Sequence, residues 1–208
     1  MAIDALEAAR KADGVTSRPD TLAHLQCATP EDVLRIGKNH FHVAFTYSWM
    51  YAEPKGYSLS TVPFFDKVSG NSYESLHNPN NFFERCTYPA KSTLDAGAIV
   101  SAGSDAPVLT RDPQPFVNME IGVTRARRGL PPLSPWQRLS VREVIDAYTI
   151  NGAKTLGREA EIGSLEVGKS ADFIVLDRNI FRIPIADVSD AKVRMTWFEG
   201  KLVHEEAP

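Results

Sequence analysis

The amino-acid sequence predicts an α/β fold, in which helices cover a parallel sheet and a smaller β unit follows. Through residues 1–160, helical segments alternate with short buried strands, an order that is typical of parallel sheets. From residue 161 onward, strands follow turns that contain Gly163 and Gly168, and the helical pattern ends. We therefore expect two units, residues 1–160 and residues 161–208.

The first 50 residues contain signals for two helices and two strands. The alanine-rich segment 1–13 is followed by Gly14, which suits the C-terminus of a helix. Thr29 and Pro30 are typical of an N-cap and the first position of a second helix. The segments expected to form buried strands are 21–27 and 42–48.

Two further regions follow before the C-terminal unit. The segment 49–83 carries several aromatic residues but is interrupted by Pro and Gly, so we expect a long functional loop or lid. Ser140 and Glu143 have the spacing of a capping box at a helix start. The strands expected after residue 161 are 171–176, 193–198 and 201–204.

Asp105 follows a short run of small and β-branched residues that begins at Ala98 and predicts a buried strand. Pro107 keeps a helix from starting at once, because the residue before a proline favours extended geometry. Asp105 should then lie at the C-terminal end of that strand, where α/β barrels carry their chemistry. A turn-capping aspartate is the alternative, since Ser-Asp before Pro is ordinary turn chemistry.

Composition and charge narrow the classes of function. The 208 residues carry a formal net charge of −3 without a basic block, so nucleic acid and membrane surfaces are not expected partners. No apolar run is long enough to cross a bilayer, and the N-terminus lacks a signal-peptide pattern. Cys27 and Cys86 are too few for a disulfide scaffold, and their spacing matches no zinc motif. We therefore expect a cytoplasmic protein.

Four segments together resemble the amidohydrolase superfamily, and more narrowly its family 3 and the YtcJ-like branch. They are LAHLQ at 22–26, SDAP at 104–107, AYTINGA at 147–153 and IGSLEVGKSADFIVLD at 162–177. The resemblance implies a metal-dependent hydrolase built as a distorted (β/α)8 TIM barrel, with a small β-sandwich made from both chain ends. Residues 1–160 would be about the last three βα units of that barrel, and residues 161–208 the C-terminal part of the sandwich.

The resemblance also implies roles for two residues. His24 corresponds to a metal ligand at the end of the sixth barrel strand, and Asp105 to the metal-binding catalytic aspartate after the eighth. That aspartate takes a proton from a metal-activated water and passes it to the leaving nitrogen. The implied cofactor is a divalent metal, with zinc the first candidate, and the implied substrate is a small-molecule amide with a non-peptide carbon–nitrogen bond.

The chain departs from the family pattern at its beginning. The family's His-x-His pair and its ligands from the fourth and fifth strands all lie before the equivalent of Met1. A catalytic metal normally keeps at least three protein ligands, and only two are identified here. This leaves two hypotheses: the C-terminal portion of a hydrolase, or a non-catalytic globular or assembly module derived from one. Either would need its open faces covered, by a second copy in a homo-oligomer or by the missing N-terminal portion.

Other histidines and aromatic residues are weaker candidates. His40 and His42 repeat the letters of the missing pair, but they begin a strand and should lie at the non-catalytic face. We expect them to be solvated or packed, and we expect structural or exposed positions for His77 and His204. The aromatic residues that follow the same strand could line a substrate pocket or pack in the core. They are Tyr47, Trp49 and Tyr51.

Overall fold

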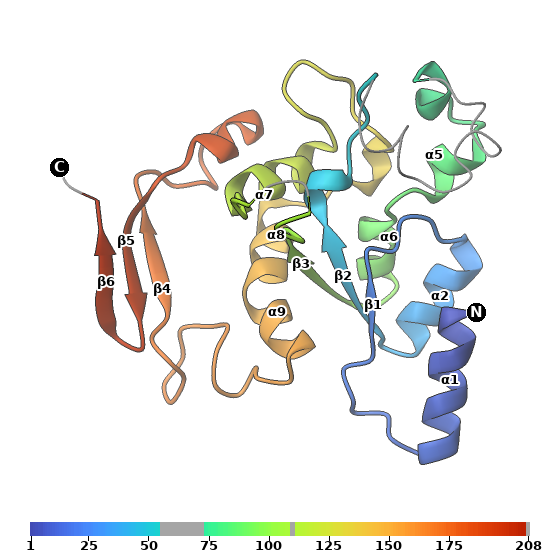
Figure 1. Ribbon diagram of the computed structural model, residues 1–208, viewed down its shortest axis with the longest axis horizontal. Helices are drawn as coiled ribbons and strands as arrows, with labels where there is room; N and C mark the ends of the chain where they lie inside the picture. The colour runs from blue at the N-terminus through green and yellow to red at the C-terminus, as the bar shows by residue number, and fades with distance from the viewer. Residues whose placement is uncertain (55–72, 109–110, 207–208) are drawn as a thin grey trace.

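The computed structural model describes residues 1–54, 73–108 and 111–206 of the chain. The N-terminal unit is a parallel sheet of three strands in the order β1-β2-β3, with helices around it (Figure 1). The strands are β1 (Thr21–Ala23), β2 (His42–Thr46) and β3 (Ile99–Gly103). The longer helices are α1 (Ala2–Asp13), α2 (Pro30–Lys38), α6 (Ala90–Asp95), α7 (Pro115–Thr124), α8 (Val141–Tyr148) and α9 (Ile150–Thr155). This architecture confirms the predicted α/β class.

Short helical segments connect these elements. They are η1 (Tyr47–Trp49), η2 (Glu74–His77), α5 (Phe82–Cys86), η3 (Pro135–Gln137) and η4 (Ile185–Asp190). Residues 55–72, which form much of the predicted functional loop, lie outside the described residues.

The local signals for helix ends are realised. Gly14 adopts a left-handed conformation with φ 70° directly after α1. The Thr29 side chain accepts a hydrogen bond from the Asp32 N–H at 3.2 Å, and Ser140 and Glu143 form both bonds of a capping box. These caps satisfy N–H groups that a helix start cannot bond internally.

The core follows the alternation of side chains along β2. Phe41, Val43 and Phe45 are buried, whereas the intervening His42 and Ala44 are partly exposed. Ile36 of α2 and Val100 of β3 join the same cluster. The helices α2 and α6 lie close together, and Gly37 makes this approach possible because a Cβ there would lie 2.1 Å from the Ala96 carbonyl oxygen.

A second, antiparallel sheet lies at the opposite end of the molecule from the N-terminus (Figure 1). Its strands are β4 (Phe173–Leu176), β5 (Val193–Phe198) and β6 (Lys201–Glu205), in that order. The segment η4 attaches this region to α7, since Val188 is buried in the main core. The Ser189 N–H also donates to the Glu120 carboxylate at 2.9 Å.

The strand expected over residues 21–27 is shorter than predicted, and this expectation was wrong in its extent. The strand β1 ends at Ala23, because His24 and Leu25 adopt positive φ values of 68° and 37°. Such a backbone turns out of the extended ladder, which the apolar pattern of the segment does not reveal. Among the described residues, no helix is both long and apolar enough to cross a membrane.

Replacing Gly37 with Ala should destabilise the protein by about 2 kcal/mol or more, because a methyl group there would collide with the backbone of Ala96. Urea denaturation measures this change. Gly152→Ala in α9 is the matched control, since its new Cβ would meet only the Ala147 carbonyl oxygen at 3.6 Å. The control should be neutral or slightly stabilising. Equal losses in both variants would contradict the close approach of α2 and α6.

Candidate active site

The carboxyl ends of the three parallel strands meet at one edge of the sheet. His24 directly follows β1, η1 directly follows β2, and Asp105 lies two residues beyond β3. Because β1 and β3 flank β2 in parallel, the sheet brings the two predicted site residues to the same edge. Ligand and catalytic sites of α/β proteins lie at this edge.

His24 is held by contacts with β2 and with η1. Its N–H donates to the Ala44 carbonyl oxygen at 2.8 Å. Its ring Nδ1 lies 3.3 Å from the Thr46 hydroxyl, and the ring stacks on Trp49 with centroids 4.8 Å apart. These contacts engage Nδ1 and one face of the ring, so the imidazole has a defined orientation. The second ring nitrogen is Nε2.

Asp105 stands in a turn. It has a φ of 53°, a conformation that Asp tolerates better than most residues, and its carbonyl oxygen accepts the Val108 N–H at 3.0 Å. The Ser104 hydroxyl accepts the Ala106 N–H at 3.2 Å. Asp105 thus lies in a turn at the carboxyl edge, and the side chain that accepts a backbone N–H in this turn is that of Ser104.

A pocket of about 170 Å³ lies beside this turn, between the ends of β2 and β3 and the helix α7. Its lining residues are Ser48, Tyr51, Ser104, Gln114, Val117, Asn118, Ile121 and Arg127. The Arg127 guanidinium lies over the Tyr51 ring at 5.4 Å and donates to the Tyr51 hydroxyl at 3.3 Å. Burial raises the pKa of this hydroxyl above its usual range.

Asn118 builds one wall of the pocket. Its Oδ1 accepts the Ser48 N–H at 2.8 Å, and its Nδ2 donates to the carbonyl oxygens of Pro113 and Gln114. The side chain is 3% exposed. It thus joins the segment after β2 to the start of α7.

The three aromatic residues that follow β2 have different environments. Tyr47 and Trp49 are buried in the main core, at 0% and 5% exposure. Tyr51 lines the pocket. The sequence pattern alone could not separate these positions, because the turn of η1 interrupts the alternation of the strand.

His40 and His42 lie at the opposite, amino end of β2, and His204 lies in the second sheet. His42 begins β2, and its Nδ1 lies 3.2 Å from the Thr155 hydroxyl of α9; burial lowers its pKa. His40 precedes β2, and its Nδ1 lies 3.2 Å from the Gly97 carbonyl oxygen. His77 ends η2, and His204 is exposed on β6.

The described residues do not by themselves make a metal centre. Within the ranges that the structure covers, no three His, Cys, Asp or Glu side chains are grouped so that they could hold a metal ion. His24 and Asp105 supply donor types that suit a divalent metal, but two ligands do not enclose a catalytic ion. The described part of the chain therefore does not fit a complete metal site.

Cys27 and Cys86 form a disulfide that the sequence did not predict. Their Cα atoms are 4.8 Å apart although 59 positions separate them along the chain. Cys27 lies three residues beyond His24 on the same loop, and Cys86 ends α5. Two cysteines at this spacing carry no pairing signal, so the fold alone brings them together.

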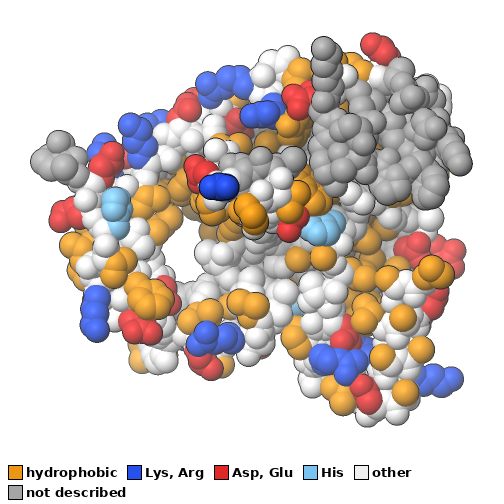
Figure 2. Space-filling model, viewed as in Figure 1, with side chains coloured by type: hydrophobic (Ala, Val, Ile, Leu, Met, Phe, Trp, Pro, Cys, Tyr) orange, Lys and Arg blue, Asp and Glu red, His pale blue; other side chains and the backbone are white. Residues whose placement is uncertain are grey.

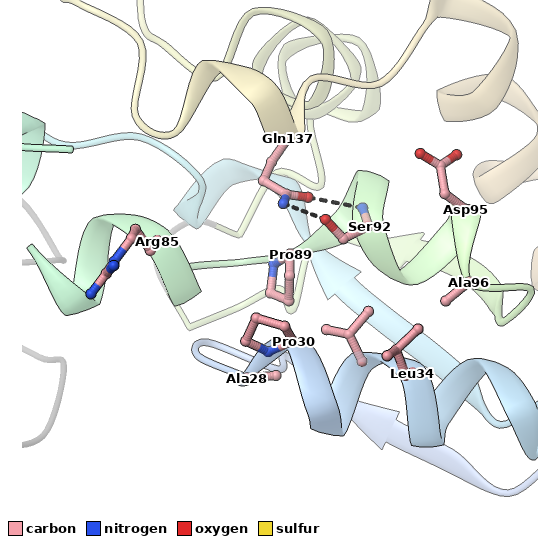
Figure 3. A pocket seen from close by; sticks show the side chains of 10 residues that line it. Ala28, Pro30, Leu34, Arg85, Pro89, Ser92, Asp95, Ala96 and Gln137 are labelled. Carbon is pink, nitrogen blue, oxygen red and sulfur yellow. Dashed lines mark hydrogen bonds between the residues drawn. The ribbon is translucent and has the colours of Figure 1, made fainter. Parts of the chain in front are cut away.

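Two larger hollows lie elsewhere. A groove of about 440 Å³ runs between α2 and α6, where the Gln137 amide bonds to Ser92 (Figure 3). A second, of about 720 Å³, lies between α8–α9 and the antiparallel sheet. Figure 2 shows the opening beside that sheet with hydrophobic side chains on its border. His24 and Asp105 line neither of these hollows, nor do they line the 170 Å³ pocket, which Asp105 adjoins through Ser104.

Comparison with known proteins places the chain in a family. Residues 1–204 match the model described as the amidohydrolase family, and the chain therefore belongs to that family. The chain is similar to N-substituted formamide deformylase from Arthrobacter pascens, with 36% identity over 118 residues. That alignment covers 57% of this chain and 21% of the deformylase.

Solved structures share the fold at low identity. An uncharacterized metal-dependent hydrolase from Pyrococcus horikoshii has a TM-score of 0.63 and 18% identity, over 88% of this chain and 33% of its own. An adenosine deaminase from Xanthomonas campestris with bound zinc has a TM-score of 0.57 and 18% identity, over 88% of this chain and 36% of its own. The chain thus spans only a minor part of the length of these relatives.

Replacing Asn118 with Ala should cost about 1–3 kcal/mol of stability, because the Ser48 N–H and two carbonyl groups lose their buried partner. Thermal and urea unfolding provide the measurement. Asn80→Ala is the control, since Asn80 is exposed and its replacement should change stability by less than about 0.5 kcal/mol. If Asn118→Ala unfolds like the wild type, the bridge between β2 and α7 is not a structural requirement.

Proposed function

We propose that this chain is the C-terminal portion of a metal-dependent amidohydrolase that cleaves a non-peptide carbon–nitrogen bond in a small-molecule amide. The observation that carries the proposal is the common edge of the parallel sheet, to which β1 and β3 bring His24 and Asp105. Membership of the amidohydrolase family supports it. The deformylase relative suggests an N-formyl or N-acyl amine as substrate.

The residues of this chain would contribute defined chemistry. The His24 imidazole would offer Nε2 as a ligand, because Thr46 and Trp49 engage the rest of the ring. The Asp105 carboxylate would accept a proton and return it to the leaving amine. The adjacent pocket would hold one substituent of the substrate between Tyr51 and Asn118.

A divalent metal would be held only when further ligands come from outside this chain. Zinc is the first candidate, because the deaminase with the same fold carries it. In the same proposal, the parallel sheet is part of a (β/α)8 barrel, and residues 161–208 are part of a β-sandwich. The second candidate is a non-catalytic module derived from such an enzyme, and it differs from the first in needing no further metal ligands.

The test of catalysis needs the chain joined to the N-terminal part of its reading frame. In that protein, His24→Ala and Asp105→Asn should each lower amine release from an N-formyl amine by at least about a hundredfold. His204→Ala is the control, since His204 lies exposed on β6 and should leave turnover unchanged. An unchanged hydrolytic rate in both variants would exclude these two residues from the chemistry.

The chain alone should neither retain a metal through dialysis nor hydrolyse the amide, because two ligands cannot enclose the ion. Metal analysis after dialysis and the same amine assay measure both properties. One tightly bound equivalent of metal with turnover would show that other residues complete the site. A full-length protein without metal or activity would instead support the non-catalytic module.

The protein should be stable when its exposed apolar faces are covered, either by a second copy in a homo-oligomer or by the N-terminal portion of the enzyme. Apolar side chains are exposed on β4, β5 and β6, among them Ile174, Phe198 and Val203 at 47%, 56% and 59%. Burying the exposed half of each side chain would contribute roughly 1 kcal/mol, about half of the value for a complete side chain. Sedimentation velocity at low micromolar concentration should therefore show self-association. A compact monomer with one sharp, reversible unfolding transition would contradict this.

A further inference from the structure

We propose that the Cys27–Cys86 disulfide is a redox-sensitive tether that positions His24 at the carboxyl edge of the sheet. The proposal deepens the proposed function, because it assigns the two cysteines a positioning role toward a residue of the candidate site. It concerns the conformation of the loop, which can be measured without any catalytic activity.

The loop between β1 and α2 needs external support. His24 and Leu25 both have positive φ, a conformation that costs free energy in residues with a side chain. Beyond Leu25, two backbone hydrogen bonds hold the loop to the end of α5 and the residues that follow it. The Tyr88 N–H donates to the Gln26 carbonyl oxygen at 2.9 Å, and the Ala28 N–H donates to the Cys86 carbonyl oxygen at 3.2 Å. The disulfide lies at the centre of this short bridge.

The other end of the tether is firmly anchored. The buried guanidinium of Arg125 donates to the carbonyl oxygens of Thr87 and Tyr88, each at 3.2 Å. The Ser134 hydroxyl donates to the Glu84 carbonyl oxygen at 2.5 Å. Cys86 itself is 2% exposed. The covalent bond therefore connects a strained loop to a rigid segment, and the loop should gain freedom when the bond opens.

The position of the disulfide allows thiol–disulfide exchange with a reductant. Cys27 is an exposed residue, so a dithiol reductant can approach its side of the bond. Disulfides are rare in a reducing cytoplasm, and those that occur there are commonly transient or redox-sensing. Two electrons and two protons pass from the dithiol to the two sulfur atoms, which leaves two thiols in the protein and one disulfide in the reductant.

Hydrogen–deuterium exchange of the whole chain, with and without dithiothreitol, tests the tether. The mass of the protein first establishes the oxidised and reduced states. On reduction, the amides of His24, Ala28 and Tyr88 should exchange at least about tenfold faster, because the bridge can open locally. The amides of β5 should keep their protection, since this strand lies in the other sheet.

A second readout follows the side chain of His24. In NMR spectra, its ring protons should lose the ring-current shift that stacking on Trp49 produces. The double variant Cys27→Ser/Cys86→Ser should show the reduced pattern and should not respond to dithiothreitol. A purely structural bond would lower protection everywhere and leave no loop-specific change.

Three results would overturn the proposal. The first is a reduced protein in which loop exchange and the His24 ring-current shift both equal those of the oxidised protein. The second is equal loss of protection in the loop and in β5. The third is a purified chain whose two thiols stay free in the presence of oxidised glutathione. Missing hydrolytic activity would leave the tether unaffected, so the two proposals fail separately.

Discussion

The buried guanidinium of Arg125 is the interaction on which the carboxyl edge of the sheet depends. It is fully buried at the end of α7, and it donates to the carbonyl oxygens of Leu133, Tyr88 and Thr87. Burial lowers its pKa, because desolvation disfavours the charged form. Leaving a buried charge without partners costs several kcal/mol, so these carbonyl groups must stay where they are. One side chain thereby holds three segments of the chain together.

The consequences of this anchor reach both parts of the candidate site. The helix α7, which ends beside Arg125, forms the pocket wall through Asn118. The segment around Thr87, which Arg125 holds, pairs with Cys27 on the loop that carries His24. The pocket near Asp105 and the loop near His24 therefore both depend on segments that the Arg125 guanidinium holds in place. A site at the edge of three strands needs such bracing, because its residues stand on turns rather than within the sheet.

The two sheets differ in how well they are covered. In the parallel sheet, β2 contributes Val43 and Phe45 to a closed core. In the antiparallel sheet, large apolar side chains remain exposed on all three strands, and η4 provides the attachment to α7. The chain matches the amidohydrolase family over residues 1–204 and spans only a minor part of the length of its relatives. Within the described residues, His24 and Asp105 are not part of any cluster of three donors, the number that a catalytic metal normally needs.

What the sequence determined by itself was local. Gly14, Thr29 and the Ser140–Glu143 pair mark helix ends through hydrogen bonds or backbone conformations that lie within a few residues. The alternation of strand and helix predicted the α/β class and the placement of Asp105 just beyond a strand. Such features depend on near neighbours, so the order of residues specifies them.

Only the tertiary structure decided the rest. The end of β1 at Ala23, the burial of Trp49 and the burial of Arg125 all depend on contacts with distant segments. The disulfide joins residues 59 positions apart, and no spacing of two cysteines predicts such a pair. These features arise from packing between segments that the fold brings together, and the energy of a contact does not depend on how far apart its residues lie in the sequence.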